Sequence, residues 1–133
     1  MYLLDTNICI YIIRKRPAEV LQTLKRKLRK EICISAITVA ELEYGAAKSQ
    51  YPEKNKIALI EFLSLFNILP FTDNDAAEYG AIRSSLEKKG QPIGSMDFLI
   101  AAQAKASNLT LVTNNVREFE RVDGLTIENW VNS

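Results

Sequence analysis

Three acidic residues stand in otherwise apolar stretches of the chain, and they are the side chains best suited to chemistry. Asp5 directly follows the apolar run Tyr2–Leu4, while Glu41 and Asp97 each lie within a mainly apolar segment of their own. An ionised carboxylate is costly to bury alone, so such groups are usually paired, hydrogen-bonded or bound to a metal ion. Three of them from distant parts of the chain predict one shared cation, and hard oxygen ligands favour Mg²⁺ or Mn²⁺.

Each of these acids also has a purely structural interpretation. Asp5 could cap a helix that begins beside it, and Asp97 could favour a helix N-terminus through the helix dipole. Glu41 closes the sequence Thr38-Val39-Ala40-Glu41, which has the form of a capping box. For Glu41 the two interpretations are evenly balanced. Helix caps alone, however, do not require three carboxylates to lie in apolar sequence.

Composition limits the remaining chemistry. The 133 residues are 47% hydrophobic and 25% charged, which is typical of one soluble globular domain spanning residues 1–133. No apolar run is long enough to cross a membrane and no secretory signal is apparent, so we expect a cytoplasmic protein. The chain has no histidine, which excludes imidazole bases and histidine triads. Cys9 and Cys33 lie in apolar runs and are expected to be buried thiols.

Basic residues are concentrated in one early segment although the net charge is only +1. Such a run is often just a solvated helix face, but it could also hold nucleic-acid phosphates. The residues in question are Arg14, Lys15, Arg16, Lys25, Arg26 and Lys27.

Strand-like and helix-like segments alternate along the chain, which predicts an α/β fold with a mainly parallel sheet covered on both faces. Pro17 and Pro52 are expected in the first turns of helices. Asp73 or Asn74 is expected to cap the helix that ends near Gly90, and Ile57, Ile60 and Leu63 are expected to line one helix face. The predicted strands cover residues 2–5, 31–35, 66–70, 109–113 and 125–127, and the predicted helices cover 6–15, 17–28, 38–48, a segment from 52, 73–89, 95–107 and 114–120.

This order of elements predicts that the acids meet. Asp5 ends the first strand, Glu41 lies one turn into the helix after the second strand, and Asp97 lies in the first turn of a later helix. The polar turn 113–115 follows another strand. In an open parallel sheet the loops after the strands gather at one edge, where ligand sites form. We therefore expect all four segments to face one cleft.

Four motifs in this order resemble the PIN-domain ribonucleases and, within them, the VapC toxins of bacterial toxin–antitoxin pairs. The resemblance spans the whole chain. The motifs are Leu4-Asp5-Thr6-Asn7, Ser35-x-x-Thr38-x-x-Glu41-Leu42 with Tyr44-Gly45-Ala46, Asp97-x-Leu99-Ile100-Ala101-Ala102-x-Ala104, and Val112-Thr113-Asn114-Asn115-x-Arg117-Glu118-Phe119.

The resemblance implies a PIN-like domain with a parallel sheet of about five strands and an RNase site that uses Mg²⁺ or Mn²⁺. Asp5 and Asp97 correspond to the metal-binding aspartates, and Glu41 corresponds to the active-site glutamate. Relatives often carry an aspartate in the turn where this chain has Asn114 and Asn115, so the fourth acid is assigned to Glu118, with Glu120 as a weaker candidate. The supporting polar residues are Asn7, Thr113 and Asn115.

The resemblance also implies partners. A VapC toxin is usually homodimeric and is inhibited by a VapB antitoxin, which here could dock on apolar helix surface around Ile10, Ile13 and Leu42 and place an arginine among the acids. The Asn-Asn turn is similar to that of enteric VapC proteins that cut initiator tRNA in its anticodon stem-loop. Because no histidine can activate a ribose hydroxyl, we expect products with 5′-phosphate and 3′-hydroxyl ends.

Two alternatives from other classes remain at this stage. A phosphatase could use Asp5 as its nucleophile, although phosphatases of the haloacid-dehalogenase type carry a second aspartate two positions later, where this chain has Asn7. A non-catalytic nucleic-acid-binding α/β module would use the basic segment and keep its acids only as helix caps.

Overall fold

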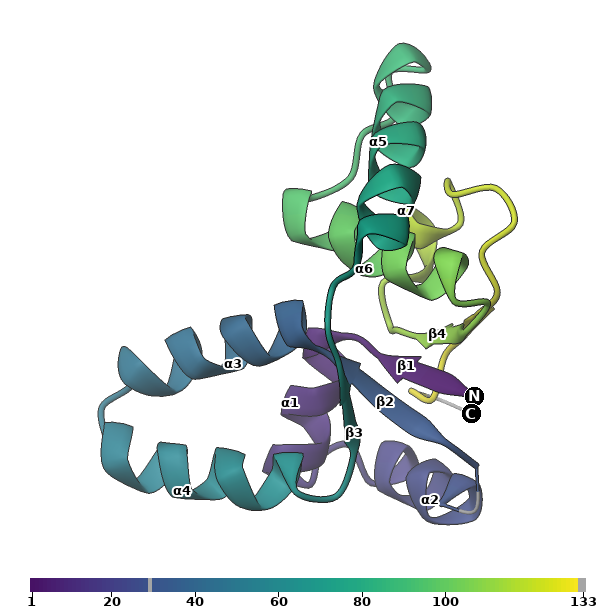
Figure 1. The fold of residues 1–133 in the computed structure, drawn as a ribbon. Coiled ribbons are helices and arrows are strands. Elements are labelled where there is room, and N and C mark those ends of the chain that lie inside the picture. The colour runs from purple at the N-terminus through teal and green to yellow at the C-terminus, as the bar shows by residue number, and fades with distance from the viewer. Residues whose placement is uncertain (29, 132–133) are drawn as a thin grey trace.

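The computed structural model describes residues 1–28 and 30–131. Within these residues, five parallel strands form one sheet in the spatial order third, second, first, fourth, fifth along the chain (Figure 1). This arrangement confirms the predicted parallel sheet. The strands are β1 (Tyr2–Leu4), β2 (Ile32–Ser35), β3 (Asn67–Leu69), β4 (Thr110–Val112) and β5 (Ile127–Glu128).

Helices connect the strands and confirm the α/β class. None of the helices in the described residues is both long and apolar enough to cross a membrane. The helices are α1 (Thr6–Arg14), α2 (Ala18–Lys27), α3 (Ala36–Ala47), α4 (Pro52–Leu63), α5 (Asp73–Lys88), α6 (Ser95–Ala106) and α7 (Val116–Phe119).

The sheet separates two apolar cores because successive side chains of a strand point to opposite faces. Leu4 and Ile34 belong to the core that includes residues of α1, α2 and α4, whereas Leu3 and Cys33 belong to the core that includes residues of α5 and α6. Figure 1 shows these two helical layers on either side of the strands. Helices therefore cover both faces, as predicted, and Cys9 and Cys33 are buried free thiols.

Two helix starts differ from the predictions, and side-chain capping explains both. Helix α3 begins at Ala36 because the Ser35 hydroxyl accepts a hydrogen bond of 3.0 Å from the Ile37 amide. Helix α5 is capped by Thr72 rather than by Asp73 or Asn74, and Thr72 forms a capping box with Asp75. A capping box at Thr38 and Glu41 is therefore wrong, because those residues lie inside α3.

Other boundaries shift by a few residues. Pro17 is the N-cap of α2 and not its first residue, while Pro52 opens α4 as predicted. The expected strand 125–127 is displaced to Ile127–Glu128, where those two residues pair with Leu111 and Val112 of β4.

The expected face of α4 is wrong in part. Ile57 and Ile60 are 59% and 56% exposed, whereas Leu59 and Phe62 are buried against the core of α1 and α2, with Leu63 partly buried beside them. The helix is thus turned so that Leu59 and Phe62, not the two isoleucines, face the core.

The capping box of α5 gives a direct test of the helix start. Thr72→Ala should lower the free energy of unfolding by about 1 kcal/mol, because the Asp75 amide loses its acceptor. Asn74→Ala, at an exposed position inside the first turn, is the matched control and should change stability by less than about 0.5 kcal/mol. Urea unfolding followed by circular dichroism measures both, and equal effects would contradict the assignment of Thr72 as the cap.

Candidate active site

The carboxyl ends of β1 and β4 mark the point where the order of the sheet reverses. From the central β1 the chain adds β2 and β3 on one side, and later adds β4 and β5 on the other. The connections after two neighbouring strands on either side of such a point leave in opposite directions, which opens a crevice at the strand ends. Asp5 follows β1 and Thr113 follows β4, so both residues lie at this switch point.

Asp5 is fixed by hydrogen bonds from both sides. It is buried, its Oδ1 accepts a hydrogen bond of 2.9 Å from the Ile8 amide, and its Oδ2 accepts one of 2.5 Å from the Thr113 hydroxyl. Burial raises the pKa of Asp5 and the Glu41 carboxylate adds to the rise, while the hydrogen bonds from Thr113 and Ile8 act against it. Asp5 is therefore a helix cap, and it also interacts electrostatically with a distant acid.

Glu41 reaches the site from α3. Its Oε1 accepts a hydrogen bond of 2.7 Å from the hydroxyl of Thr6, the first residue of α1. The hydroxyls of Thr6 and Thr38 lie 3.3 Å apart, so a chain of polar groups joins α1 to α3. Sequence reasoning assigned no role to Thr6, although its place directly after Asp5 in the first motif was a usable signal.

Asp97 completes the convergence from the first turn of α6. Burial, followed by the carboxylates of Glu118, Asp5 and Glu41, raises the pKa of Asp97 to about 6. The other three predicted acids therefore all act on Asp97. A Cβ on Gly94 would approach Oδ2 of Asp97 to 3.2 Å, so the glycine leaves space beside this oxygen.

The remaining predicted site residues differ in how they contact Asp5, Thr113 and Asp97. Glu118 lies in α7 and raises the pKa of Asp97, whereas Glu120 does not contribute to that shift and is exposed. The Asn115 amide donates to the Thr113 hydroxyl at 2.9 Å. Asn7 contributes a backbone hydrogen bond that lowers the pKa of Asp5, and its side chain is exposed. Asn7 and Asn115 thus act here through their backbones.

The structure does not bring the basic segment to the carboxylates. Helix α1 starts at the site, so Arg14 at its other end is about 12 Å farther along the axis, and Lys15 and Arg16 continue beyond it; all three are exposed. The Nζ of Lys27 is 5.3 Å from the centre of the ring of Tyr2, the first residue of β1, and 3.7 Å from a carboxylate oxygen of Glu128.

The other two members of the segment lie on the same helix as Lys27. Arg26 donates to the Thr23 hydroxyl at 3.1 Å, and Lys25 is exposed. These positions belong to the end of α2, which leads to the beginning of β2 and not to the strand ends that carry the acids. An RNA strand held by this segment would therefore lie away from Asp5 and Asp97.

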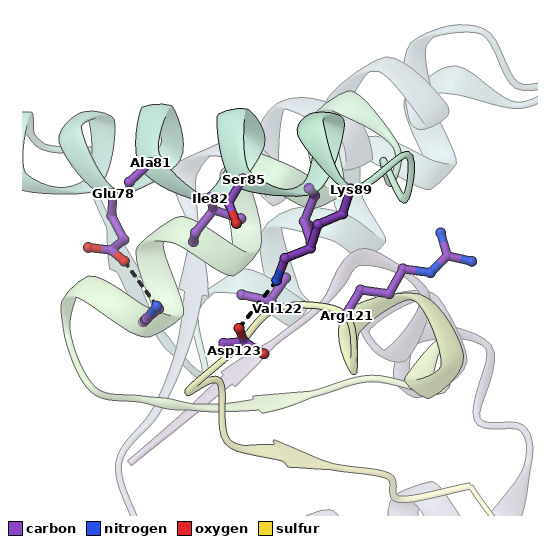
Figure 2. Close-up of a pocket in the computed structure, with 10 residues that line it drawn as sticks. Glu78, Ala81, Ile82, Ser85, Lys89, Arg121, Val122 and Asp123 are labelled. Atoms are coloured by element: carbon purple, nitrogen blue, oxygen red, sulfur yellow. Dashed lines mark ion pairs between the residues drawn. The ribbon is translucent and has the colours of Figure 1, made fainter.

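A hollow of about 160 Å³ between α5, α6 and the segment after α7 is separate from the carboxylates (Figure 2). Four of its five charged side chains already pair with one another, Lys105 with Glu78 at 3.4 Å and Lys89 with Asp123 at 3.6 Å, and the fifth, Arg121, donates to the Pro92 carbonyl. None of the predicted acids lines it. The acids at the switch point, and not this hollow, form the candidate active site.

Comparisons with known proteins agree with this location. The PIN domain family model matches residues 2–125. Ribonuclease VapC2 of Haemophilus influenzae is 51% identical over 130 residues, which cover 98% of both chains. The tRNA(fMet)-specific endonuclease VapC of Shigella flexneri is 44% identical over 129 residues and 97% of both chains. The chain belongs to the PIN-domain VapC ribonuclease family.

Solved structures of the VapC family share the fold along nearly the full chain. The crystal structure of VapBC2 from Rickettsia felis, bound to a DNA fragment from their promoter, includes a chain with a TM-score of 0.92 and 45% identity, over 97% of this chain and 98% of that one. The crystal structure of DNA-bound VapBC from Salmonella typhimurium gives a TM-score of 0.91 at 41% identity, over 97% of each chain.

The raised pKa of Asp97 predicts a pH-dependent cost to folding. Ionisation of Asp97 is harder in the folded chain than in the unfolded one, so its contribution becomes unfavourable as pH rises from about 4 through about 6. Without divalent ions, Asp97→Asn should be more stable than the wild type at pH 7.5, and this advantage should shrink as pH falls to 4. Urea unfolding in EDTA at several pH values measures it, and a pH-independent difference would contradict the shift.

Proposed function

We propose that the protein is the toxin of a VapBC-type pair and a metal-dependent endoribonuclease with residues 1–133 as one PIN-like domain. Family membership supports the reaction class. The observation that supports the assignment of residues is that carboxylates from three other elements, Glu118, Asp5 and Glu41, add to the rise in the pKa of Asp97. RNA substrates of this kind are cytoplasmic, so we place the protein in the cytoplasm.

The donor set fits Mg²⁺ or Mn²⁺. The four acids offer hard oxygen ligands, and a cation among them would relieve the repulsion that raises the pKa of Asp97. Within the described residues no three such side chains are already arranged around one point that could hold an ion. Binding would therefore require side-chain rotation, for which the space beside Gly94 provides room at Asp97.

Asp5 and Asp97 are the proposed metal ligands. These two residues would hold the divalent ion, which would supply a coordinated water of lowered pKa and offset negative charge on the scissile phosphate. Glu41 and Glu118 orient the attacking water or receive its proton. Water attacks phosphorus, the bond from phosphorus to the 3′ oxygen breaks, and that oxygen takes up a proton from solvent, so the products carry 5′-phosphate and 3′-hydroxyl ends. The chain has no histidine to activate a 2′-hydroxyl for the alternative route.

The proposed substrate is the anticodon stem-loop of initiator tRNA. The relatives from Shigella flexneri and Salmonella typhimurium, at 44% and 41% identity, are both named tRNA(fMet)-specific endonucleases. An unpaired loop suits a site at a sheet edge, because its phosphates can approach the carboxylates and their ion without opening a duplex.

The proposed protein partner is a VapB-type antitoxin, together with a second copy of this chain. Solved relatives are described as VapBC complexes. Of the apolar residues expected to receive the antitoxin, Ile10 and Ile13 are partly exposed, but Leu42 is only 7% exposed. Leu42 belongs to the core and is not available as a docking residue. An antitoxin arginine among the acids would compete with the metal ion for the same carboxylates, because both are cations.

The alternatives are less well supported. A phosphatase of the haloacid-dehalogenase type needs a second aspartate two positions after Asp5, and this chain has Asn7 there, with its side chain exposed. Glu41 makes no capping box, so a binding module whose acids are only caps does not account for it.

Cleavage of total tRNA tests the proposed activity. The purified chain, freed of antitoxin, should cut with Mg²⁺ or Mn²⁺ and not with EDTA, and Asp5→Asn and Asp97→Asn should reduce the rate by more than about 100-fold, since each removes a charged ligand. Sequencing should find 5′-phosphate and 3′-hydroxyl ends. Equal cutting by wild type and variants would indicate a contaminant, and 2′,3′-cyclic phosphates would exclude the hydrolytic route.

The hydrogen bond from Thr6 to Glu41 predicts a positioning role. Thr6→Val keeps the shape of the side chain but removes the donor, so Glu41 should lose its fixed orientation and kcat should fall by about 10-fold, with KM little changed. Thr6→Ser retains a hydroxyl and should recover most of the rate. A Thr6→Val enzyme with wild-type kcat would show that this contact does not support the reaction.

A further inference from the structure

The outer surface of α3 combines an aromatic ring with a positive charge. Tyr44 is 66% exposed, and the Nζ of Lys48 lies 4.8 Å from the centre of its ring. Single exposed aromatic residues are ordinary on protein surfaces. This pair is notable because of its position relative to the acids of the active site.

Tyr44 and Lys48 follow Glu41 on the same face of α3. Residues three and seven positions apart on a helix share a face, and along the axis Tyr44 is about 4.5 Å and Lys48 about 10 Å beyond Glu41. Gly45 lies between them, and a Cβ there would meet no atom within 4 Å. Figure 1 shows α3 extending away from the end of β2 and leading into α4. The face is therefore an open path that starts at the carboxylates and leads outward.

The charges on this path favour a polyanion. Glu43, the neighbouring acid on α3, forms an ion pair with Lys56 of α4. Among the described residues no carboxylate lies within ion-pair distance of Lys48, whose ammonium group is exposed beside the ring. Lys48 can thus contact a phosphate without first breaking an ion pair.

We propose that Tyr44 and Lys48 bind the RNA segment next to the scissile phosphate, with an unpaired base stacked on the tyrosine ring and a phosphate beside the lysine. This inference rests on the proposed ribonuclease function and names its substrate-binding residues. Aromatic rings stack with any nucleobase, and a nearby cation holds the backbone. These two residues take the role that the sequence suggested for the basic segment of α1 and α2, which lies away from the acids.

Binding can be measured separately from cleavage. In the Asp97→Asn background, anisotropy of a short fluorescein-labelled single-stranded RNA gives Kd without turnover. Tyr44→Ala should raise Kd by about 5- to 100-fold, the usual effect of losing one stacked base, and Tyr44→Phe should stay within about twofold of the parent. Lys48→Gln should weaken binding and reduce the salt dependence by about one phosphate contact.

Tyr51 supplies the matched control. It is 60% exposed like Tyr44, but it precedes α4 at the far end of α3 from Glu41. Tyr51→Ala should leave Kd unchanged. In the active enzyme, Tyr44→Ala should raise KM for tRNA by about the same factor as Kd while kcat changes little. Circular dichroism of each variant checks that the fold is retained.

The outcomes distinguish this inference from the proposed function. If the wild type cuts no RNA with either metal, the ribonuclease assignment fails, and the anisotropy series still tests the binding site. If the wild type cuts RNA but Tyr44→Ala keeps its Kd and KM, the binding site is wrong. Loss of self-association or antitoxin binding in Tyr44→Ala, with RNA affinity unchanged, would identify this face as a protein interface and overturn the proposal.

Discussion

Negative charge gathered at one edge of a parallel sheet is the constraint on which the rest of this structure depends. Burial, followed by the carboxylates of Glu118, Asp5 and Glu41, raises the pKa of Asp97 there to about 6. Without a cation this arrangement opposes folding, because ionised like charges repel. The burial of the two apolar cores and the hydrogen bonds around Asp5 must offset that cost. The apolar residues that flank the acids in the sequence supply part of that burial.

The hydrogen bonds tie the site to the far edge of the sheet. The Asp5 amide donates to the Val112 carbonyl at 3.0 Å, and the Thr113 amide donates to the Glu128 carbonyl at 3.0 Å. The Thr113 hydroxyl then donates to Asp5. The position of Asp5 therefore depends on the pairing of β1 with β4 and of β4 with β5, so the last strand supports the site although it contributes no acid.

Much of this arrangement could be predicted because the strands are short apolar runs followed directly by polar residues. The order of strands and helices, the place of Asp5 and the convergence of Glu41 and Asp97 all follow from that pattern and from the geometry of parallel sheets. The rotation of α4 could not be predicted, since Ile57 and Ile60 are as apolar as the buried Leu59 and Phe62. Their burial depends on where α4 lies against α1 and α3. The first residues of α3 and α5 could not be predicted either, because several adjacent polar side chains could have formed each N-cap. In the structure the caps are Ser35 and Thr72.

The location of the basic segment likewise could not be predicted from the sequence. Charge counts identify basic residues, but the direction of α1 and α2 decides which end of the sheet they occupy. Lys27 illustrates the point, because its Nζ lies 5.3 Å from the centre of the ring of Tyr2, the first residue of β1, whereas Asp5 follows the last residue of that strand. By contrast, Tyr44 and Lys48 share a helix with Glu41, so their direction from the site is fixed by helical periodicity alone.

The topology that gathers the acids also moderates their repulsion. In a parallel α/β sheet the helices after the strands begin at the carboxyl edge, so their N-termini face the site. Asp5 caps α1, Asp97 lies in the first turn of α6, and Glu118 lies in that of α7. Each helix N-terminus favours a nearby anion by about 0.3–1 kcal/mol. That contribution opposes the effects of burial and of three neighbouring carboxylates, which raise the pKa of Asp97. The residual negative charge is the feature on which the proposed binding of a divalent cation at this edge of the sheet rests.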